Sequence, residues 1–425
     1  MVTIPSENNT PQYFTSDVAL LFLTRFVRLF AYGSLSVVLV FYLTDLGLST
    51  AQTGVLFTLT LVGDTVISFY LTTRADRIGR RRMLIVGALL MIAAGVIFAI
   101  THSFLWLTMA ATIGVISPSG NEVGPFLSIE QAALSSVISD QARTQIFAWY
   151  TLAGSFATAL GALATGAITH AFHKTAATPL GGYRAIVVLY AVLGIVLLLA
   201  FNRLTPAAEV NLHESPDLSA GMRKFFGIGH SYSVVLKLSC LFALDSFGGG
   251  FVVQSFAAYW FYLRFGLTPA SLGVIFFVAN LLSGVSALLA SRLASRIGLV
   301  RTMVFTHLPS NILLILIPLM PNLPLAIAVL FLRFSISQMD VPTRQSYTMA
   351  VVPPHERSAA AGITGVSRTT GAALAPVLAG FLFARPSLIS APFFIAGTLK
   401  IIYDLLLYQS FSAITPPEES ETAVK

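Results

Sequence analysis

The stretch that decides the fold separates two long apolar segments and reads Arg74-Ala75-Asp76-Arg77-Ile78-Gly79-Arg80-Arg81-Arg82. The apolar segment before it covers residues 52–72, and the one after it covers residues 83–101. Each is long enough for a helix that crosses hydrocarbon about 30 Å thick, which takes roughly twenty residues. Arginine-rich loops between such segments collect on the cytoplasmic side of a membrane. The stretch therefore predicts two membrane-spanning helices that are joined on the cytoplasmic side.

The composition of the whole chain also indicates a membrane protein. Of its 425 residues, 56% are hydrophobic and 10% are charged, and the mean hydropathy is +0.81. So few charges cannot coat a water-exposed surface, and most of the outer surface must therefore face lipid. The formal net charge is +7, but the basic residues are scattered between apolar segments, so we expect no nucleic-acid partner. The single cysteine, Cys240, permits no intramolecular disulfide.

Outward from this loop, the hydropathy pattern predicts twelve helical spans, near residues 18–43, 52–72, 83–101, 105–135, 145–170, 184–203, 232–263, 271–291, 301–320, 323–350, 358–383 and 388–411. The only long polar stretch inside the chain, residues 204–230, separates the sixth span from the seventh and is expected to be a cytoplasmic linker. The predicted domains are a six-helix bundle at residues 1–203 and a second bundle with a short cytoplasmic tail at residues 231–425. The expected fold class is an all-α integral membrane protein with two pseudo-symmetric six-helix bundles.

The basic residues of the loops predict the orientation. If the N-terminus is cytoplasmic, the same side receives the arginines of residues 74–82, of the linker and of residues 292–301. The opposite side then carries little beyond Lys174, Arg184, Arg264 and Arg385. This bias places both termini in the cytoplasm. We expect a multi-pass protein of the bacterial inner membrane.

An internal repeat relates the two predicted halves. Gly47-Leu48-Ser49-Thr50-Ala51 recurs as Gly266-Leu267-Thr268-Pro269-Ala270, and Arg77-Ile78-Gly79 recurs as Arg296-Ile297-Gly298. Both matches have the same offset of 219 residues. Repeated segments at a constant offset indicate that the halves are parallel copies of one unit.

The loop at residues 76–82 resembles the Asp-Arg-x-Gly-Arg-Arg/Lys core of the signature loop of the major facilitator superfamily. Pro354-His355-Glu356-Arg357 is similar to the Pro-Glu-x-Arg element of that superfamily, and residues 140–143 form a weaker copy. One difference is that residues 71–73 lack the glycine that normally opens the signature loop. The resemblance covers nearly the whole chain and is closest to the drug and sugar efflux branches. It implies a fold of twelve transmembrane helices.

The resemblance also implies that the signature loop acts as a gate on the cytoplasmic side. Asp76 can accept hydrogen bonds from a helix N-terminus across the interface between the halves, and Arg77 is expected to pair with Glu130. The alternative is that the arginines only determine topology, an interpretation that suits residues 80–82. The candidate gating residues are Asp76, Arg77, Gly79, Arg80, Glu130, Arg143, Glu356 and Arg357.

Polar side chains within the spans are the candidates for a substrate and proton site, because ionisable groups are costly in a membrane and are often functional. The resemblance implies that spans one, four, seven and ten line a central cavity. Among the candidates, Glu122 and Asp245 are expected to carry a coupled proton, since a proton can neutralise a buried carboxylate. The full set is Arg25, Arg28, Tyr32, Asp64, Asn121, Glu122, Asp245, Gln254, Arg333 and Asp340.

The same charges have a structural interpretation as permanent ion pairs. Arg25 with Asp245, or Arg28 with Glu122, would fasten the halves together. Asp340 and Arg344 have the i,i+4 spacing of a helical pair, although Pro342 lies between them, and Lys400 and Asp404 share that spacing in the last span. A buried ion pair is weak evidence for more than structure, so both interpretations stay open.

The sequence lacks the motifs of ATP-driven pumps and membrane enzymes. It contains no Gly-x-x-x-x-Gly-Lys-Ser/Thr, no cluster of metal ligands and no Gly-x-Ser-x-Gly nucleophile motif. We therefore expect no enzymatic activity, no metal and no cofactor, and a proton gradient as the energy source.

The expected function is secondary active transport of a small organic solute by alternating access, with proton-coupled export favoured. The alternative is proton-coupled uptake of an organic anion, which paired arginines would suit. A non-transporting receptor or scaffold is a third interpretation. The expected partners are a small-molecule substrate, protons and membrane lipids, and the protein is expected to be a monomer.

Overall fold

The computed structural model describes residues 15–412 except for residues 123, 139, 175–177, 210–230, 354 and 355. The side chains of residues 73, 76, 77, 140–145 and 358 also lie outside the described part. Every regular element within these limits is helical.

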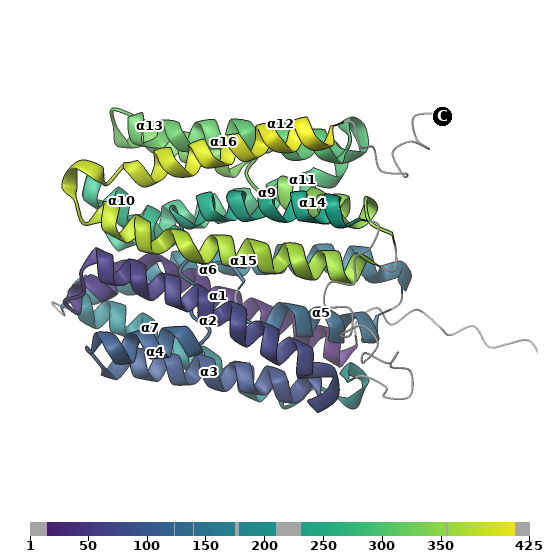
Figure 1. Cartoon of the computed structure of the whole chain (residues 1–425). Coiled ribbons are helices and arrows are strands. Elements are labelled where there is room, and N and C mark those ends of the chain that lie inside the picture. The colour runs from purple at the N-terminus through teal and green to yellow at the C-terminus, as the bar shows by residue number, and fades with distance from the viewer. Residues whose placement is uncertain are drawn as a thin grey trace, which may run out of the picture.

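The first seven α-helices follow each other along the chain before residue 204. They are α1 (Ser16–Asp45), α2 (Thr50–Ile78), α3 (Arg80–Ile100), α4 (Phe104–Ile113), α5 (Phe126–Val137), α6 (Asp140–Lys174) and α7 (Pro179–Phe201), followed by the 3₁₀ turn η1 (Pro206–Ala208). The second series is α9 (Tyr232–Gly250), α10 (Gln254–Phe265), α11 (Pro269–Ile297), α12 (Leu299–Leu316), α13 (Leu323–Phe334), α14 (Asp340–Ala350), α15 (Arg357–Phe383) and α16 (Ala391–Phe411). In Figure 1 the first series occupies the lower part of the molecule and the second series the upper part.

The predicted count of membrane spans is confirmed. The described residues contain ten helical segments that are long and apolar enough to cross a membrane, and two shorter apolar helices, α4 and α13. Each short helix is continued by a second one, α5 or α14, so these two pairs complete twelve spans. Large apolar side chains such as Val66, Phe69 and Ile100 are exposed, as expected for a surface that faces lipid.

The internal repeat has a backbone counterpart. Helices α2 and α11 begin and end 219 residues apart, as the sequence repeat predicts. Gly79 and Gly298 end these helices with φ values of 112° and 89°, and Gly47 and Gly266 precede them with φ values of 91° and 68°. Positive φ favours glycine, which explains why the repeat keeps glycine at these junctions.

Three of the predicted spans are broken, which is a correction to the continuous helices expected at residues 105–135, 232–263 and 323–350. The fourth span is non-helical at residues 114–125, where prolines lack an N–H and Gly120 and Gly124 have positive φ. The seventh is interrupted after Gly250. The tenth is interrupted between α13 and α14, because the ring of Pro342 would clash with the carbonyl of residue 338 in a continuous helix.

Glycines allow the two series of helices to approach closely. Helix α2 packs against α15, and α6 packs against α11. A Cβ atom added at Gly380 would lie 2.5 Å from the carbonyl oxygen of Thr50, and one added at Gly273 would lie 2.5 Å from that of Ala162. These helix pairs therefore pack backbone against backbone, as small residues permit in membranes.

Two substitutions in α15 test this packing. Gly380→Ala should lower the midpoint of thermal unfolding of the purified protein, because its Cβ would collide with the backbone of α2. Gly362→Ala is the matched control, since its Cβ would meet no atom within 4 Å. The control should gain about 0.5–1 kcal/mol of folding stability, because alanine favours a helix more than glycine does. Equal effects of the two changes would contradict the close α2–α15 contact.

Candidate functional site

The three helix breaks locate the candidate site in the middle of the bundle. Irregular backbone at membrane depth is tolerated only where protein or a water-filled cavity surrounds it. Helices broken at corresponding positions of the two halves, as in the fourth and tenth spans, are typical of transporter binding sites. At the break of the seventh span, Ser255 of α10 donates hydrogen bonds to the carbonyl oxygens of Ser36 and Pro118, so this break meets the one in the fourth span.

The first buried charge cluster is centred on Arg28 of α1, whose side chain is fully buried. Its Nε lies 2.6 Å from Oε1 of Glu122, and its two Nη atoms each lie 2.7 Å from an oxygen of Glu130. Arg25 Nη1 donates to Oε2 of Glu122 over 2.9 Å. The hydroxyl groups of Thr24 and Tyr150 donate to Glu130. The cluster therefore ties α1 to α5, to α6 and to the break of the fourth span.

These contacts bear on three expectations from the sequence. The pairing of Arg28 with Glu122 is confirmed, but both residues lie in the first half, so the pair does not fasten the two halves together. The alternative pairing of Arg25 with Asp245 is wrong, because Arg25 contacts Glu122. Glu130 is fully buried and its two oxygens accept from donors of α1 and α6, whereas the side chain of Arg77, its expected partner, lies outside the described part of the chain, so that pairing stays a prediction.

Asp64 of α2, which is partly buried, differs from Glu122 and Glu130 of this half. Its Oδ1 accepts hydrogen bonds from the backbone N–H of Gly124 and from Ser68 Oγ, the latter over 3.2 Å. Among the described residues, no arginine, lysine or histidine forms an ion pair with it. Asp64 is thus held by the break of the fourth span but has no cationic partner in the described part of the chain.

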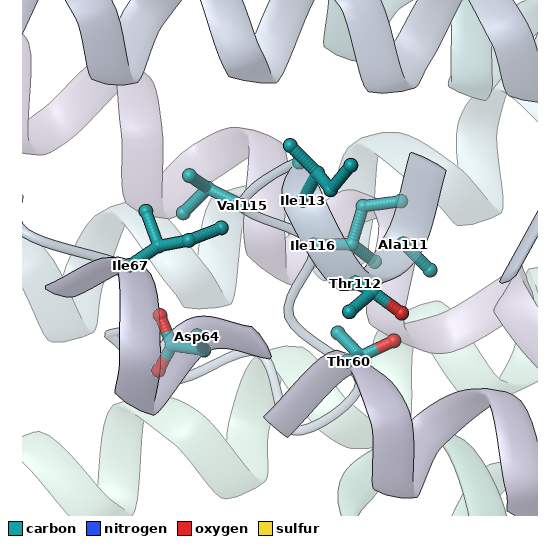
Figure 2. Close-up of a pocket in the computed structure, with 9 residues that line it drawn as sticks. Thr60, Asp64, Ile67, Ala111, Thr112, Ile113, Val115 and Ile116 are labelled. Atoms are coloured by element: carbon teal, nitrogen blue, oxygen red, sulfur yellow. The ribbon is translucent and has the colours of Figure 1, made fainter. Parts of the chain in front are cut away.

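Asp64 also borders a small pocket between α2 and α4 (Figure 2). Its other lining residues are Thr60, Ile67 and residues 111–116. The pocket volume of about 10 Å³ has room for about one water molecule. It is therefore too small for an organic solute but could bring water to the carboxylate.

The second buried charge cluster surrounds Asp245 of α9. Its Oδ2 lies 2.9 Å from Nη1 of Arg344, and its Oδ1 lies 2.5 Å from Nζ of Lys400. Arg344 also contacts Asp340 across 3.3 Å, so the expected i,i+4 pair is confirmed at the start of α14. This cluster connects α9, α14 and α16 in the second half, as the Arg28 cluster connects helices in the first.

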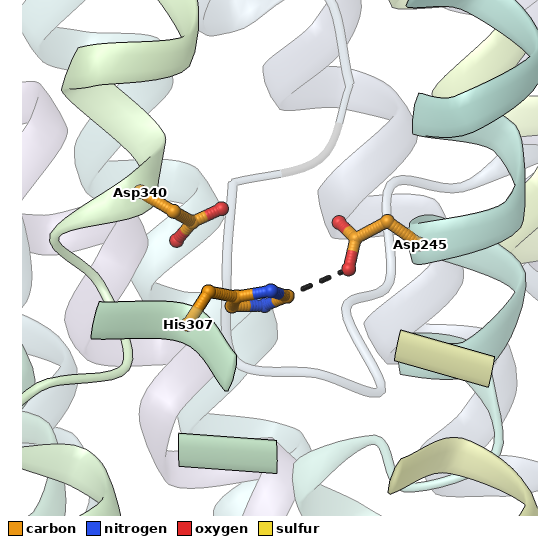
Figure 3. A group of neighbouring side chains, drawn as sticks. All are labelled: Asp245, His307 and Asp340. Atoms are coloured by element: carbon orange, nitrogen blue, oxygen red, sulfur yellow. Dashed lines mark ion pairs between the residues drawn. The ribbon is translucent and has the colours of Figure 1, made fainter. Parts of the chain in front are cut away.

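His307 of α12 joins this cluster and was not identified from the sequence. Its Nε2 lies 3.6 Å from Oδ1 of Asp245 (Figure 3). Its Nδ1 lies 2.8 Å from Oδ1 of Asp404. Asn311 donates to the second oxygen of Asp404 over 2.9 Å. The available signal was the i,i+4 spacing of His307 and Asn311 in an otherwise apolar segment. A neutral imidazole can donate to only one of its two carboxylate neighbours, whereas an imidazolium can donate to both.

The expected pair of Lys400 with Asp404 is wrong. Lys400 reaches across to Asp245 instead, and Asp404 contacts His307 and Asn311. Both residues lie in the last span, which was expected to be peripheral, but their side chains are buried against α9 and α12. Interhelical contacts have replaced the local i,i+4 pair because they satisfy charges that would otherwise be buried without partners.

Three residues of this cluster have the composition of a metal site. Ligand atoms of Asp245, His307 and Asp340 lie within 4.8 Å of one another (Figure 3). However, each oxygen of Asp245 is already in contact with a cationic group, from Arg344 or Lys400. A divalent ion bound there would lie next to two positive charges, so the arrangement does not favour a metal.

The remaining candidates are dispersed around the breaks. Tyr32 is fully buried beside Tyr190, and the side chain of Asn121 is exposed. Gln254 donates to Ser36 Oγ over 2.8 Å and accepts from Asn280 over 3.2 Å. Arg333 lies in the last turn of α13, directly before the break of the tenth span.

The side chains of Asp76, Arg77 and Arg143 lie outside the described part of the chain, so their gating role stays a prediction. Within the described part, Glu209 accepts hydrogen bonds from the backbone N–H groups of Arg80 and Arg81, over 2.7 and 3.1 Å. A carboxylate stabilises a helix N-terminus, so Glu209 caps α3. Glu209 lies in the linker expected at residues 204–230, and this role was not predicted from the sequence.

The described contacts of Arg80 are within the first half. Its Nη1 donates to the carbonyl oxygens of Ala132 and Ala208, over 3.1 and 3.3 Å. In the second half, the buried Glu356 accepts from the N–H of Ser231 over 3.2 Å, at the start of α9, while Arg357 donates to the carbonyl of Met349 over 2.9 Å. These contacts fasten helix ends within each half.

The Arg28 cluster leads to a stability prediction. Arg28→Met should lower stability by about 3–5 kcal/mol, because it leaves Glu130 buried without a cation. The double variant Arg28→Met/Glu130→Gln should regain much of the lost stability. Arg82→Met, at an exposed position, is the control and should change the stability little. The readout is the midpoint of thermal unfolding in detergent. A single variant Arg28→Met as stable as the wild type would contradict the described network.

Comparisons with known proteins agree with this geometry. The family model described as Major Facilitator Superfamily matches residues 21–339 and 238–424. An uncharacterized membrane protein of Saccharomyces cerevisiae, YJR124C, is 31% identical over 424 residues, which cover 94% of each chain. Because this relative is a yeast protein, it gives no support to the expected location in a bacterial membrane. The family model covers the superfamily as a whole and does not single out the drug and sugar efflux branches.

Solved structures share the fold at low sequence identity. The crystal structure of the nucleoside transporter NupG has a TM-score of 0.73 at 12% identity, and covers 93% of this chain and 99% of that one. The crystal structure of a D-xylose-proton symporter has a TM-score of 0.70 at 13% identity, and covers 94% of this chain and 96% of that one.

Proposed function

Because the chain belongs to the major facilitator superfamily, and is therefore a multi-pass membrane transporter and not an enzyme, we propose that it couples the movement of a small organic solute to a proton gradient. The observation that carries the coupling is Asp64, a carboxylate beside a helix break for which the described residues provide no cation. The D-xylose-proton symporter shows that this fold accommodates proton coupling.

Alternating access requires a seal that closes one side of the site. Phe41 of α1 packs edge-to-face on Tyr259 and Tyr262 of α10, with ring centroids 5.7 and 5.2 Å apart. Nearby, the N–H of Val377 in α15 donates to Thr58 Oγ1 of α2 over 3.0 Å. With both termini in the cytoplasm, as the loop arginines predict, these contacts form an outer seal. The protein then works by rocking residues 1–203 against residues 231–425, with residues 204–230 as the linker.

Asp64 is the first candidate for the proton-carrying group. Glu122 contacts two arginines, and Asp245 contacts Arg344, Lys400 and His307. In this state their charges are already balanced, so a proton would compete with these cations. Asp64 has only hydrogen-bond donors, and a proton is the simplest way to neutralise it inside a membrane. Asp245 is the second candidate for the proton-carrying group, because the titratable His307 lies beside it.

Two directions of transport are compatible with this coupling. Proton-coupled export is the first candidate, and proton-coupled uptake of an organic anion is the second. A pH gradient of either sign across a vesicle membrane distinguishes them, because a symporter accumulates solute on the alkaline side and an antiporter on the acidic side. A receptor or scaffold would give no solute flux under either gradient.

The coupling is tested by Asp64→Asn in proteoliposomes with an imposed pH gradient. Radiolabelled succinate, benzoate, xylose and tetraphenylphosphonium serve as anionic, neutral and cationic probes. The wild type should accumulate at least one of them, and the variant should accumulate it no more than vesicles without a gradient. Exchange of labelled for unlabelled solute should persist, because a permanently neutral carrier can still change conformation.

The control is Asp45→Asn, which removes an exposed carboxylate at the end of α1 and should leave accumulation unchanged. Wild-type accumulation by Asp64→Asn would show that Asp64 does not carry the proton. Absence of gradient-dependent accumulation of every probe by the wild type would contradict proton coupling.

A further inference from the structure

Two partly buried arginines of the second half differ from the buried cations of the two charge clusters. Arg25, Arg28, Arg344 and Lys400 each have a carboxylate partner. Arg333 and Arg368 form no ion pair and donate no hydrogen bond to any described residue, and the Nε of each is buried without an acceptor. The one described contact of the Arg333 guanidinium is with an aromatic ring, that of Phe334, at 5.1 Å.

Both guanidinium groups belong to helices that border the candidate site. Arg333 lies in the last turn of α13, at the break of the tenth span, which is a favourable place for a cation because helix C-termini carry partial negative charge. Arg368 lies in α15, three residues after Gly365 and therefore on the same side of the helix. A Cβ atom added at Gly365 would meet nothing within 4 Å, so this side of α15 borders open space. Both arginines are only partly buried.

The charges around the two arginines are unbalanced. Arg368 lies within electrostatic reach of Arg344, Asp245 and Asp340, and Arg333 lies within reach of Asp340. The described cluster has three carboxylates, those of Asp245, Asp340 and Asp404. Against them stand four permanent cations, Arg333, Arg344, Arg368 and Lys400, so one positive charge is in excess even when His307 is neutral.

We propose that Arg333 and Arg368 bind the anionic group of the transported solute, which is an organic acid that carries a carboxylate or a phosphate. This inference rests on the proposed transport function and specifies its substrate class. A guanidinium binds either group through two parallel hydrogen bonds, and an unpaired guanidinium inside a membrane is retained at a cost in stability. An incoming anion supplies the missing negative charge, whereas a cationic solute would add to the excess.

The inference is tested by ligand binding to the purified protein, without transport or a proton gradient. Succinate, benzoate and glycerol 3-phosphate are the anionic probes, and succinamide, benzamide and glycerol are their uncharged counterparts. Binding to the folded state raises the midpoint of thermal unfolding. At least one acid should raise it in the wild type, and its uncharged counterpart should not.

The variants Arg333→Gln and Arg368→Gln should each weaken this binding about tenfold or more, because a charge-assisted pair is lost. Without ligand, both should be at least as stable as the wild type, since each change removes a partly buried charge that has no described ion-pair partner. Arg385→Gln, at an exposed arginine beyond the end of α15, is the matched control and should bind as the wild type does.

Unchanged acid binding by both glutamine variants would overturn the inference, as would the absence of any shift with all three acids. A loss of stability in the unliganded variants would indicate a structural role instead. Phosphatidylglycerol is tested in a separate arm, because a lipid phosphate has the same chemistry, and stabilisation by this lipid alone would overturn the assignment to a solute. Arginine-dependent acid binding without gradient-driven transport would support the inference and contradict only the proton coupling.

Discussion

The structure depends on the constraint that a charge inside a membrane needs a partner of opposite charge. Arg28 meets this constraint through Glu122 and Glu130, and Asp245 meets it through Arg344 and Lys400. Each cluster joins helices that are distant in sequence, so each half of the molecule has its own buried ionic centre. Removing one member would leave its partners charged and unpaired, which is more damaging than the loss of the contact itself.

The helix breaks supply residues to the same centres. At the fourth span, residues 114–125 leave the helical path and bring Glu122 to Arg25 and Arg28, while the N–H of Gly124 reaches Asp64. At the tenth span, the break ends directly before Asp340, which contacts Arg344. Broken helices are costly in lipid, but here the irregular backbone lies inside the bundle. The breaks therefore place polar groups at mid-depth without exposing them to lipid.

The contacts between the halves are of a different kind. Helix α2 against α15 and α6 against α11 approach through glycines, and α1 meets α10 through aromatic rings and a few hydroxyl groups. None of these described contacts is an ion pair. Surfaces without fixed ion pairs can separate and meet again at little electrostatic cost, as rocking of two halves requires.

Three groups next to these breaks form no ion pair with any described residue. Asp64 borders the fourth span, and Arg333 and Arg368 border the tenth. Paired groups fasten each half, whereas an unpaired group inside a membrane can respond to a proton or a solute. On the proposed mechanism, this division separates the stabilising charges from the responsive ones.

The sequence by itself determined the class of protein, the twelve spans and the repeat of 219 residues, because these depend on local hydropathy, on loop arginines and on glycines that need positive φ. It also predicted most of the candidate residues. Only the tertiary structure decided which charges pair and where spans break. Arg28 meets Glu130 across 102 residues and Lys400 meets Asp245 across 155, so helix packing selected those partners over local alternatives such as Asp404. Spacing along a helix identifies neighbours on one face, but a buried charge is satisfied by whichever helix packs against that face.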